Sequence, residues 1–336
     1  MEETIGEIGE FGLIGRVAHD LLYRPELVKI GAGDDGAVYM IPSGFDQVIS
    51  TDTMVEGIHF ARETMTSYDV GCKLCASNFS DMAAMGAEAV GFVISAALPR
   101  NLPVSWVESC YEGIRHYCKT YRVNLLGGDV TGAAGGIVLT GTVVGMVPEG
   151  KAVRRSGAKA GELVFVTGTL GDSAAGLEAL FEGKGASWPS LTERHQRPQP
   201  QIEKGIRLRE AGASSLNDIS DGLSRELNEI AAASGVTIEI DKEKIPISEE
   251  AKAFGSVLGK DPVLWALNGG EDYQLTGTIR REGWEKLSDK EGITIIGEVK
   301  DVSHGRLYMR TRGERVLLLP KGYDHFKTGG KKSCTP

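Results

Sequence analysis

Six short segments place carboxylates beside glycine, serine, threonine or asparagine, at points where a loop meets an apolar run. They are residues 31–38, 50–52, 78–81, 127–129, 218–222 and 268–272. Clustered carboxylates are unfavourable unless cations neutralise them, and oxygen ligands of this kind suit Mg²⁺. Because Mg²⁺ binds through a few carboxylates together with substrate phosphates, the set indicates a site for a phosphate-bearing nucleotide.

Each of these carboxylates, taken alone, also has a structural explanation. Asp218 or Asp221 could cap the helix that follows, and Asp129 could close a turn. Only the recurrence of one pattern in six places favours a shared metal site over separate structural roles.

The first segment, GAGDDGAV, contains the G-x-G-x-x-G pattern of dinucleotide-binding loops. Such a loop needs a helix directly after its glycines, whereas residues 37–42, AVYMIP, form a β-like run that ends at proline. Two carboxylates would also repel a bare diphosphate, by about 4 kcal/mol for each charge pair at ~4 Å and an effective dielectric of ~20. We therefore exclude dinucleotide binding through this loop. The sequence also lacks a Walker loop, the protein-kinase motifs and an EF-hand loop.

Composition narrows the possible partners of the protein. The 336 residues carry 37 Lys and Arg against 46 Asp and Glu, a net charge of −9 without a dense basic run, so a nucleic-acid partner is not expected. No apolar run approaches the ~20 residues of a membrane span, and the acidic N-terminus does not resemble a signal peptide.

Five scattered cysteines fit a reducing cytoplasm. The C-x-x-C pair Cys72 and Cys75 is expected to be two small helix residues rather than a zinc or redox site.

Periodicity predicts strands and helices in both halves of the chain, without a regular βαβ alternation. Strands are expected at residues 27–30, 37–41, 47–50, 91–98, 123–126, 137–147, 163–166, 236–240, 273–279, 294–299, 307–309 and 316–319. Helices are expected at residues 68–85, 103–121, 172–181, 202–211 and 221–233, and loops at 183–200 and 217–220. The turn at residues 148–150 separates a first domain, 1–148, from a second, 149–328, and residues 329–336 are expected to be a disordered tail.

Eight segments resemble the family of bacterial thiamine-monophosphate kinases. In chain order they are GAGDDGAV, STDTMVEGIHF, NFSDMAAMGA, LLGGDVT, RRSGAKAGELVFVTGTLGDSAAGL, NDISDGL, NGGEDYQL and KGYDHF, which run from Gly31 to Phe326. The second and third are shared in outline by a wider superfamily that includes aminoimidazole-ribonucleotide synthetase, selenophosphate synthetase and a hydrogenase maturation protein. NGGEDY and GYDHF are more specific to the thiamine enzymes.

The resemblance implies a two-domain, mixed α/β (α+β) PurM-like fold. It implies a homodimer in which two N-terminal sheets form a barrel, with a C-terminal α/β domain in each chain. The implied reaction is ATP-dependent phosphorylation of thiamine monophosphate to thiamine diphosphate, with several Mg²⁺ ions.

The resemblance also implies roles for particular residues. Asp35, Asp129 and Asp221 would be catalytic, and the metal ligands would be Asp35, Asp52, Asp81, Asp129, Asp218 and Asp221, assisted by Asp34, Ser50 and Thr51. ATP would contact Gly128, Arg155 and Ser220, and the thiamine substrate would contact His59, Glu271 and Tyr323. The sequence departs from the family at Asn268 and Gln274, where serine and glutamate are expected.

The chemistry of the reaction fits these residue types. The acceptor is a phosphate monoester whose oxygen is nucleophilic near neutral pH, so direct in-line transfer needs charge neutralisation rather than a strong base or a phosphoenzyme. A guanidinium at Arg155 suits phosphate oxygens, and a carboxylate at Glu271 complements the thiazolium charge. Each has a structural alternative: Arg155 as a solvated surface cation, His59 as a half-buried histidine, and Tyr323 as an anchor for the C-terminus.

Three other functions remain open from the sequence. A sister enzyme of the superfamily would act on a different acceptor. A non-catalytic domain would bind Mg²⁺ and nucleotide without turnover. A metal-dependent phosphatase would release inorganic phosphate without thiamine monophosphate.

Overall fold

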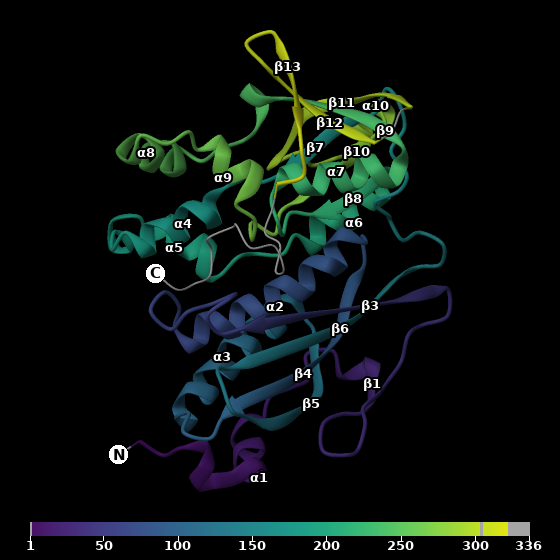
Figure 1. Cartoon of the computed structure of the whole chain (residues 1–336). Helices are drawn as coiled ribbons and strands as arrows, with labels where there is room; N and C mark the ends of the chain where they lie inside the picture. The colour runs from purple at the N-terminus through teal and green to yellow at the C-terminus, as the bar shows by residue number, and fades with distance from the viewer. Residues whose placement is uncertain (1, 303–304, 322–336) are drawn as a thin grey trace. The chain divides into compact units, whose positions relative to one another are not determined.

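The computed structural model describes residues 2–302 and 305–321, and within them the chain divides into two compact units. The first comprises residues 2–82 and 88–150, and the second comprises residues 83–87, 151–302 and 305–321. Figure 1 shows the first in purple to blue-teal and the second mainly in teal, green and yellow. No helix in the described part of the chain is long and apolar enough to cross a membrane.

The first unit contains a four-stranded sheet of order β3-β6-β4-β5. Its strands are β3 (Phe45–Val55), β4 (Glu88–Pro99), β5 (Asn124–Ala133) and β6 (Val138–Pro148), and only β4 and β5 pair in parallel. Helix α2 (Ser67–Ala84) lies against one face of this sheet, since a Cβ added to Gly141 of β6 would meet Asn78, and one added to Gly145 would meet Met82. Helix α3 (Val104–Tyr121) presents the predicted apolar stripe that includes Val104, Val107 and Ile114.

Hydroxyl and exposed apolar side chains line the other face of this sheet. Thr51 and Thr53 of β3 lie opposite Thr142 and Thr140 of β6, with hydroxyl oxygens 3.1 and 2.9 Å apart. On the same face Ile49 is 70% exposed. In the chain described here, this face is therefore open.

Smaller elements complete the first unit. Helix α1 (Ile5–Val17) contacts α3, and the 3-10 turn η1 (Pro25–Leu27) precedes a short hairpin of β1 (Val28–Ile30) and β2 (Val38–Tyr39). This hairpin carries the GAGDDGAV segment, and a strand rather than a helix follows Gly36, which confirms the argument against a dinucleotide loop.

The second unit contains a seven-stranded mixed sheet of order β13-β12-β9-β11-β7-β10-β8. Its strands are β7 (Leu163–Thr167), β8 (Ala213–Asp218), β9 (Val236–Asp241), β10 (Leu275–Ile279), β11 (Ile293–Val302), β12 (Arg306–Thr311) and β13 (Glu314–Leu318). Its helices are α4 (Asp172–Phe181), α5 (Pro189–Gln196), α6 (Ile202–Glu210), α7 (Leu223–Ser234), α8 (Glu249–Leu258), α9 (Val263–Asn268) and α10 (Arg281–Lys286), with 3-10 turns η2 (Gly185–Ser187) and η3 (Lys242–Lys244). Helix α7 contacts β8, β9, β10 and β12 through the stripe Leu223, Leu227 and Ile230 that its sequence predicted.

Several predicted boundaries were wrong. β3 continues through residues 50–52 and β5 continues through residues 127–129, so these two carboxylate segments lie inside strands rather than at strand ends. Asn217 and Asp218 end β8 instead of lying in a loop, and α5 occupies the region 183–200 that was expected to be irregular. Helices α1, α8, α9 and α10 were not predicted. The strands were underestimated because the Ser, Thr, Asp and Gly residues within them break the apolar alternation on which strand prediction depends.

Candidate functional site

The first unit brings together the predicted residues of β3 and α2. Ser50 Oγ donates a 2.5 Å hydrogen bond to Asp81 Oδ2, and the backbone N–H of Asp52 donates to Asn78 Oδ1 at 3.2 Å. Asn78 and Asp81 share one side of α2 because they are three residues apart. Thr51 points to the other face, where its hydroxyl donates to the carbonyl of Gly141 at 2.7 Å.

Strand register separates Asp52 from Asp129. Asp52 lies opposite Gly141 of β6, whereas Asp129 lies opposite Ser95 of β4. Ser95 in turn lies opposite Thr140, the partner of Thr53. Residues directly opposite one another share a face and sequence neighbours alternate, so within one chain Asp129 belongs to the open face and Asp52 to the face covered by α2.

Two further predicted positions lie in loops of the first unit. Asp34 and Asp35 are exposed between β1 and β2, where Asp34 Oδ1 accepts a 2.9 Å hydrogen bond from the backbone N–H of Asp35. His59 follows β3 and is half-buried; its Nδ1 accepts from the backbone N–H of Val55 at 3.0 Å, which leaves the proton of the neutral ring on Nε2. A Cβ added to Gly128 would lie 2.1 Å from the carbonyl oxygen of Ile94. Only glycine therefore allows β5 to lie this close to β4 at residue 128.

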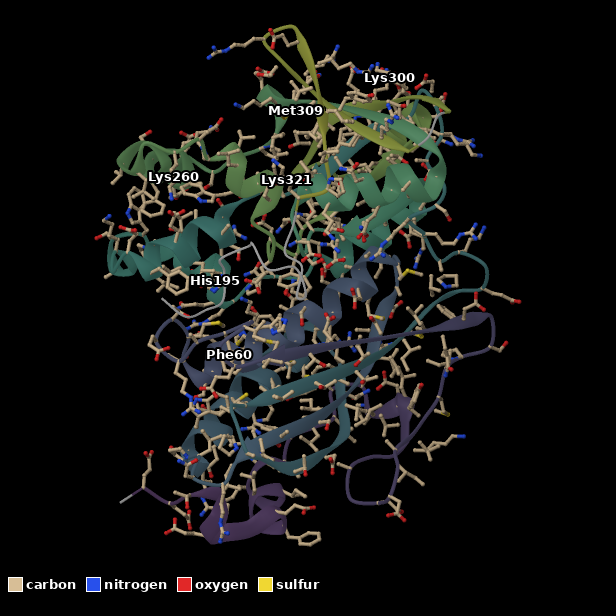
Figure 2. The ribbon with its side chains drawn as sticks, viewed as in Figure 1. Phe60, His195, Lys260, Lys300, Met309 and Lys321 are labelled. Atoms are coloured by element: carbon tan, nitrogen blue, oxygen red, sulfur yellow. The ribbon has the colours of Figure 1, made fainter. Side chains whose placement is uncertain are left out.

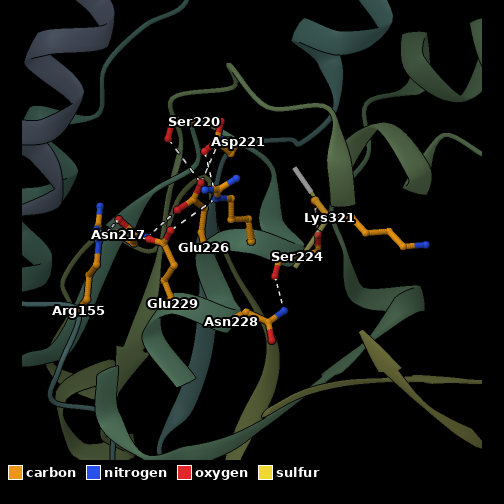
Figure 3. A network of polar contacts seen from close by, with 10 residues as sticks. Arg155, Asn217, Ser220, Asp221, Ser224, Glu226, Asn228, Glu229 and Lys321 are labelled. Atoms are coloured by element: carbon orange, nitrogen blue, oxygen red, sulfur yellow. Dashed lines mark hydrogen bonds and ion pairs between the residues drawn. The ribbon is translucent and has the colours of Figure 1, made fainter. Parts of the chain in front are cut away.

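A polar network in the second unit connects the predicted nucleotide and metal residues (Figure 3). Arg155 Nε donates to Asn217 Oδ1 at 2.9 Å, and Asn217 Nδ2 donates to Glu226 Oε2 at 2.7 Å. Glu226 Oε1 accepts from the backbone N–H of Asp221 at 3.0 Å and from Ser220 Oγ at 3.4 Å. The network therefore runs from Arg155 to the Ser220–Asp221 turn through two residues that the sequence analysis did not identify.

Charged side chains surround this network. Arg155 Nη1 lies 3.4 Å from Glu229 Oε2, and Arg225 Nε lies 3.3 Å from Asp221 Oδ2 and 3.6 Å from Glu229 Oε1. Burial, followed by the negative charge of Asp218, raises the pKa of Glu226 to about 8. Asp218, Asp221 and Glu229 outnumber Arg155 and Arg225 even when Glu226 is protonated, so the local field is negative.

Neither Asp218 nor Asp221 caps α7. The N-cap of α7 is Gly222, without a side-chain cap hydrogen bond, and Asp218 is the last residue of β8. The structural explanation considered for these two residues is therefore wrong. At the start of α7, Ser224 Oγ donates instead to the carbonyl of Lys321 at 2.8 Å, while Tyr323 lies outside the described residues.

Glu271 lies in a loop that is joined to the Ser220 turn. Its backbone has φ = 57°, in the left-handed region, and its N–H donates to the carbonyl of Ser220 at 2.7 Å. Its Oε2 lies 3.6 Å from Nδ1 of His195, a residue of α5 that is only 1% exposed and is labelled in Figure 2. Ser173 Oγ lies 3.2 Å from the same ring nitrogen.

Asp272 follows Glu271 and is buried. It accepts hydrogen bonds from the backbone N–H groups of Gly171 at 2.7 Å and Ser173 at 3.2 Å, at the start of α4. Burial raises the pKa of Asp272 to about 7 despite these two donors. Asp272 therefore anchors α4, whereas its neighbour Glu271 is directed toward His195.

The predicted metal ligands divide between the units. Asp218 and Asp221 belong to the second unit, and the others belong to the first. Among residues 2–302 and 305–321, no three His, Cys, Asp or Glu side chains are grouped closely enough to hold a metal ion. Cys72 and Cys75 are buried on α2, where their sulfur atoms contact the carbonyls of Gly113 and Ile114 of α3, as expected for structural helix residues.

Sequence reasoning missed Asn217, Glu226, Glu229 and His195. One signal was present for Glu226: it falls between Leu223, Leu227 and Ile230 on the apolar stripe of α7, so its carboxylate had to be buried. No comparable signal existed for Asn217, whose partner Arg155 is 62 residues away in the sequence, or for His195, whose partner Glu271 belongs to a distant loop.

Comparison with known proteins gives a consistent result over most of the chain. Residues 33–147 match the N-terminal domain, and residues 159–310 the C-terminal domain, of the AIR synthase related protein family. The chain is 38% identical over 328 residues to thiamine-monophosphate kinase of Bacillus subtilis, covering 95% of this chain and 99% of that protein.

Solved structures agree. The thiamine-monophosphate kinase of Stenotrophomonas maltophilia has a TM-score of 0.77 at 33% identity, covering 90% of this chain and 95% of that one. A structure described as AaThiL complexed with AMPPCP and TMP has a TM-score of 0.76 at 35% identity, covering 95% of this chain and 98% of that one. The chain belongs to the thiamine-monophosphate kinase family.

Proposed function

We propose that this protein transfers the γ-phosphoryl group of ATP to the phosphate of thiamine monophosphate, giving thiamine diphosphate and ADP. The observation that carries the proposal is similarity along nearly the whole chain to thiamine-monophosphate kinases, one of which was solved with AMPPCP and TMP. The transfer is direct and in-line, because the acceptor phosphate is already nucleophilic and needs no covalent intermediate.

The second unit supplies cationic and polar groups for the nucleotide. Arg155 is held by Asn217 and Glu229, yet its side chain remains 57% exposed, so its guanidinium can still reach phosphate oxygens. Ser220 and Gly128 are the other nucleotide contacts that we propose. Their task is to hold the donor phosphate in line with the acceptor, which contributes more than acid–base chemistry to this kind of reaction.

The carboxylates fit Mg²⁺. Burial raises the pKa of Glu226, and the charges of Asp218, Glu229 and Asp221 add to this effect at the β8–α7 turn, where a hard divalent cation would relieve their repulsion. We propose that several ions bind the carboxylates of Asp35, Asp52, Asp81, Asp129, Asp218 and Asp221, with Asp34, Ser50 and Thr51 assisting. When bound, Mg²⁺ neutralises phosphate charge in the transition state. Asp35, Asp129 and Asp221 are the residues whose loss is expected to affect turnover most.

Glu271 is the proposed counter-charge for the thiazolium ring. Its left-handed backbone is sustained by the hydrogen bond to Ser220, and uncommon backbone conformations of this kind concentrate at ligand sites. His59 and Tyr323 are the other proposed substrate contacts.

We further propose a homodimer in the cytoplasm. The face of the first sheet that carries Ile49 and the threonine pairs Thr51–Thr142 and Thr53–Thr140 is open in one chain. A second copy placed against it would form the barrel implied by the family, and Asp129 lies on this same face.

One incubation separates the possible functions. The protein is mixed with Mg²⁺, ATP and thiamine monophosphate, and products are resolved by chromatography. Thiamine diphosphate and ADP in equal amounts support the proposal. If thiamine monophosphate is not phosphorylated but another phosphate or carboxylate acceptor is, the protein is a sister enzyme of the superfamily. Release of inorganic phosphate without an acceptor indicates a phosphatase. Nucleotide binding without any product indicates a non-catalytic domain.

A further inference from the structure

Glu226 is a carboxylate in a position that the helix pattern reserves for an apolar side chain. It lies on α7 beside Leu223 and Leu227 and is 2% exposed. A buried carboxylate is unfavourable unless its oxygens accept hydrogen bonds. Its retention at this position therefore requires an account of what those oxygens do.

Both oxygens of Glu226 accept hydrogen bonds from the turn between β8 and α7. Oε2 accepts from Asn217 Nδ2 at 2.7 Å, while Oε1 accepts from the backbone N–H of Asp221 at 3.0 Å and from Ser220 Oγ at 3.4 Å. One side chain thus fixes the two ends of the turn that contains Asp218, Ser220 and Asp221 (Figure 3).

Asn217 passes this constraint on to Arg155. The two ends of its amide have opposite polarity: the oxygen accepts from Arg155 Nε at 2.9 Å, and the nitrogen donates to Glu226. The amide can adopt only one orientation. Because Arg155 can only donate, the Asn217 oxygen must face it, and the Asn217 nitrogen then faces residue 226. Residue 226 must therefore supply a hydrogen-bond acceptor.

We propose that Glu226 is a positioning residue for the nucleotide, which acts through Asn217 on Arg155 and through Ser220 and Asp221 on the β8–α7 turn. It does not touch the substrates. This role rests on the proposed function only in that a nucleotide is bound.

The polarity of the network supplies the test. In Glu226→Gln the side chain keeps its shape, but its single oxygen cannot accept from both Asn217 and Asp221. The amide nitrogen at 226 then faces an N–H group of one of them, and two hydrogen-bond donors oppose each other. The double variant Asn217→Asp with Glu226→Gln, called the exchange variant, swaps the carboxylate and the amide. One oxygen of the aspartate at 217 accepts from Arg155, and the other accepts from the amide nitrogen at 226. The 3.2 Å contact of Asn217 Nδ2 with Glu229 Oε2 is then replaced by one between two carboxylate oxygens, which is the remaining cost of the exchange.

Binding of Mg²⁺ with AMPPCP is measured by calorimetry without thiamine monophosphate, alongside the thermal unfolding midpoint. Both are measured at about pH 9, where both oxygens of the unchanged Glu226 are acceptors. Glu226→Gln is expected to weaken AMPPCP binding about tenfold, which corresponds to about 1.4 kcal/mol. The exchange variant is expected to recover most of the affinity.

Glu162→Gln is the matched control. Glu162 is also a buried glutamate of the second unit, 3% exposed, and accepts from Ser214 Oγ and the backbone N–H of Lys159, outside the network. It should lower the unfolding midpoint and leave AMPPCP affinity unchanged.

Two results would overturn the proposal: a folded Glu226→Gln that binds AMPPCP like the unchanged protein, or a folded exchange variant that binds as weakly as the single variant. If Glu226→Gln does not fold, the exchange variant alone decides. Should the protein make no thiamine diphosphate while these affinity changes are observed, the proposed acceptor is wrong and the positioning role stands.

Discussion

The backbone N–H of Glu271 donates a 2.7 Å hydrogen bond to the carbonyl oxygen of Ser220. Two further bonds join the same segments, from Tyr273 N–H to Ile219 and from Ile219 N–H to Gln274. The turn proposed to bind nucleotide and metal is thereby held to the loop proposed to bind the thiamine ring. Displacement of either segment should affect both substrates.

Gly270→Ala tests this connection. Gly270 has φ = +74°, and an added Cβ would lie 2.4 Å from the carbonyl oxygen of Ser220. We expect KM to rise for both ATP and thiamine monophosphate, and the free energy of unfolding to fall by more than the ~1–2 kcal/mol of left-handed strain alone. Steady-state kinetics and urea unfolding measure these effects.

Gly150→Ala is the control for Gly270→Ala. Gly150 has a similar φ of +69°, but nothing lies within 4 Å of its added Cβ. It should therefore show the strain without the change in KM. Equal kinetic effects in the two variants would show that the contact with Ser220 is not what couples the loops.

Glu271→Gln should separate the two substrates. The substitution removes the carboxylate charge near the proposed thiazolium site but retains the backbone bond to Ser220, so we expect KM for thiamine monophosphate to rise about tenfold or more, with the affinity for ATP nearly unchanged. Saturation curves for each substrate measure both quantities. Equal losses for ATP and thiamine monophosphate would argue against contact with the thiamine ring.

Helix α7 shows how far the sequence could predict the site. The spacing of Leu223, Leu227 and Ile230 predicted the helix and its buried face correctly. That same spacing marked Glu226 as buried, but not its partner. Asn217 comes from β8, and the position of its side chain depends on the strand order of a seven-stranded sheet, which local periodicity does not contain.

Asp52 and Asp129 show the same limit in the first unit. Both were predicted as metal ligands from their neighbours in sequence. Their faces depend on the register of β3, β6, β4 and β5, because a shift of one residue reverses the face of every side chain. Only the paired strands reveal that one carboxylate lies under α2 and the other on the open face.

Asp129→Asn should largely abolish turnover while leaving the fold intact. The side chain is exposed within its own chain, so the substitution costs the fold of that chain little stability. Loss of a carboxylate proposed to bind metal should lower kcat by about 100-fold or more. Initial rates at saturating substrates, with circular dichroism, measure the two effects. Asp20→Asn, an exposed carboxylate of the same unit, is the control, and near-normal activity of Asp129→Asn would refute the metal role.

Asp272→Asn should change how stability depends on pH. The buried Asp272 carboxyl has a pKa raised from 3.8 to about 7, so between these values the folded chain holds a proton that the unfolded chain has released. The stability contributed by protonated Asp272 is complete below pH ~4 and is lost as the pH rises through about 7. The asparagine cannot ionise. The free energy of unfolding of the unchanged protein should therefore exceed that of the variant by more at pH 5 than at pH 8. Urea unfolding at both pH values measures it. Asp289→Asn is the control, because the N–H of Glu291 and the nearby Arg207 lower the pKa of Asp289, so this carboxyl is ionised at both pH values and the effect of its substitution should be the same at both. A difference between the unchanged protein and Asp272→Asn that is the same at both pH values would mean that burial does not hold the proton on Asp272.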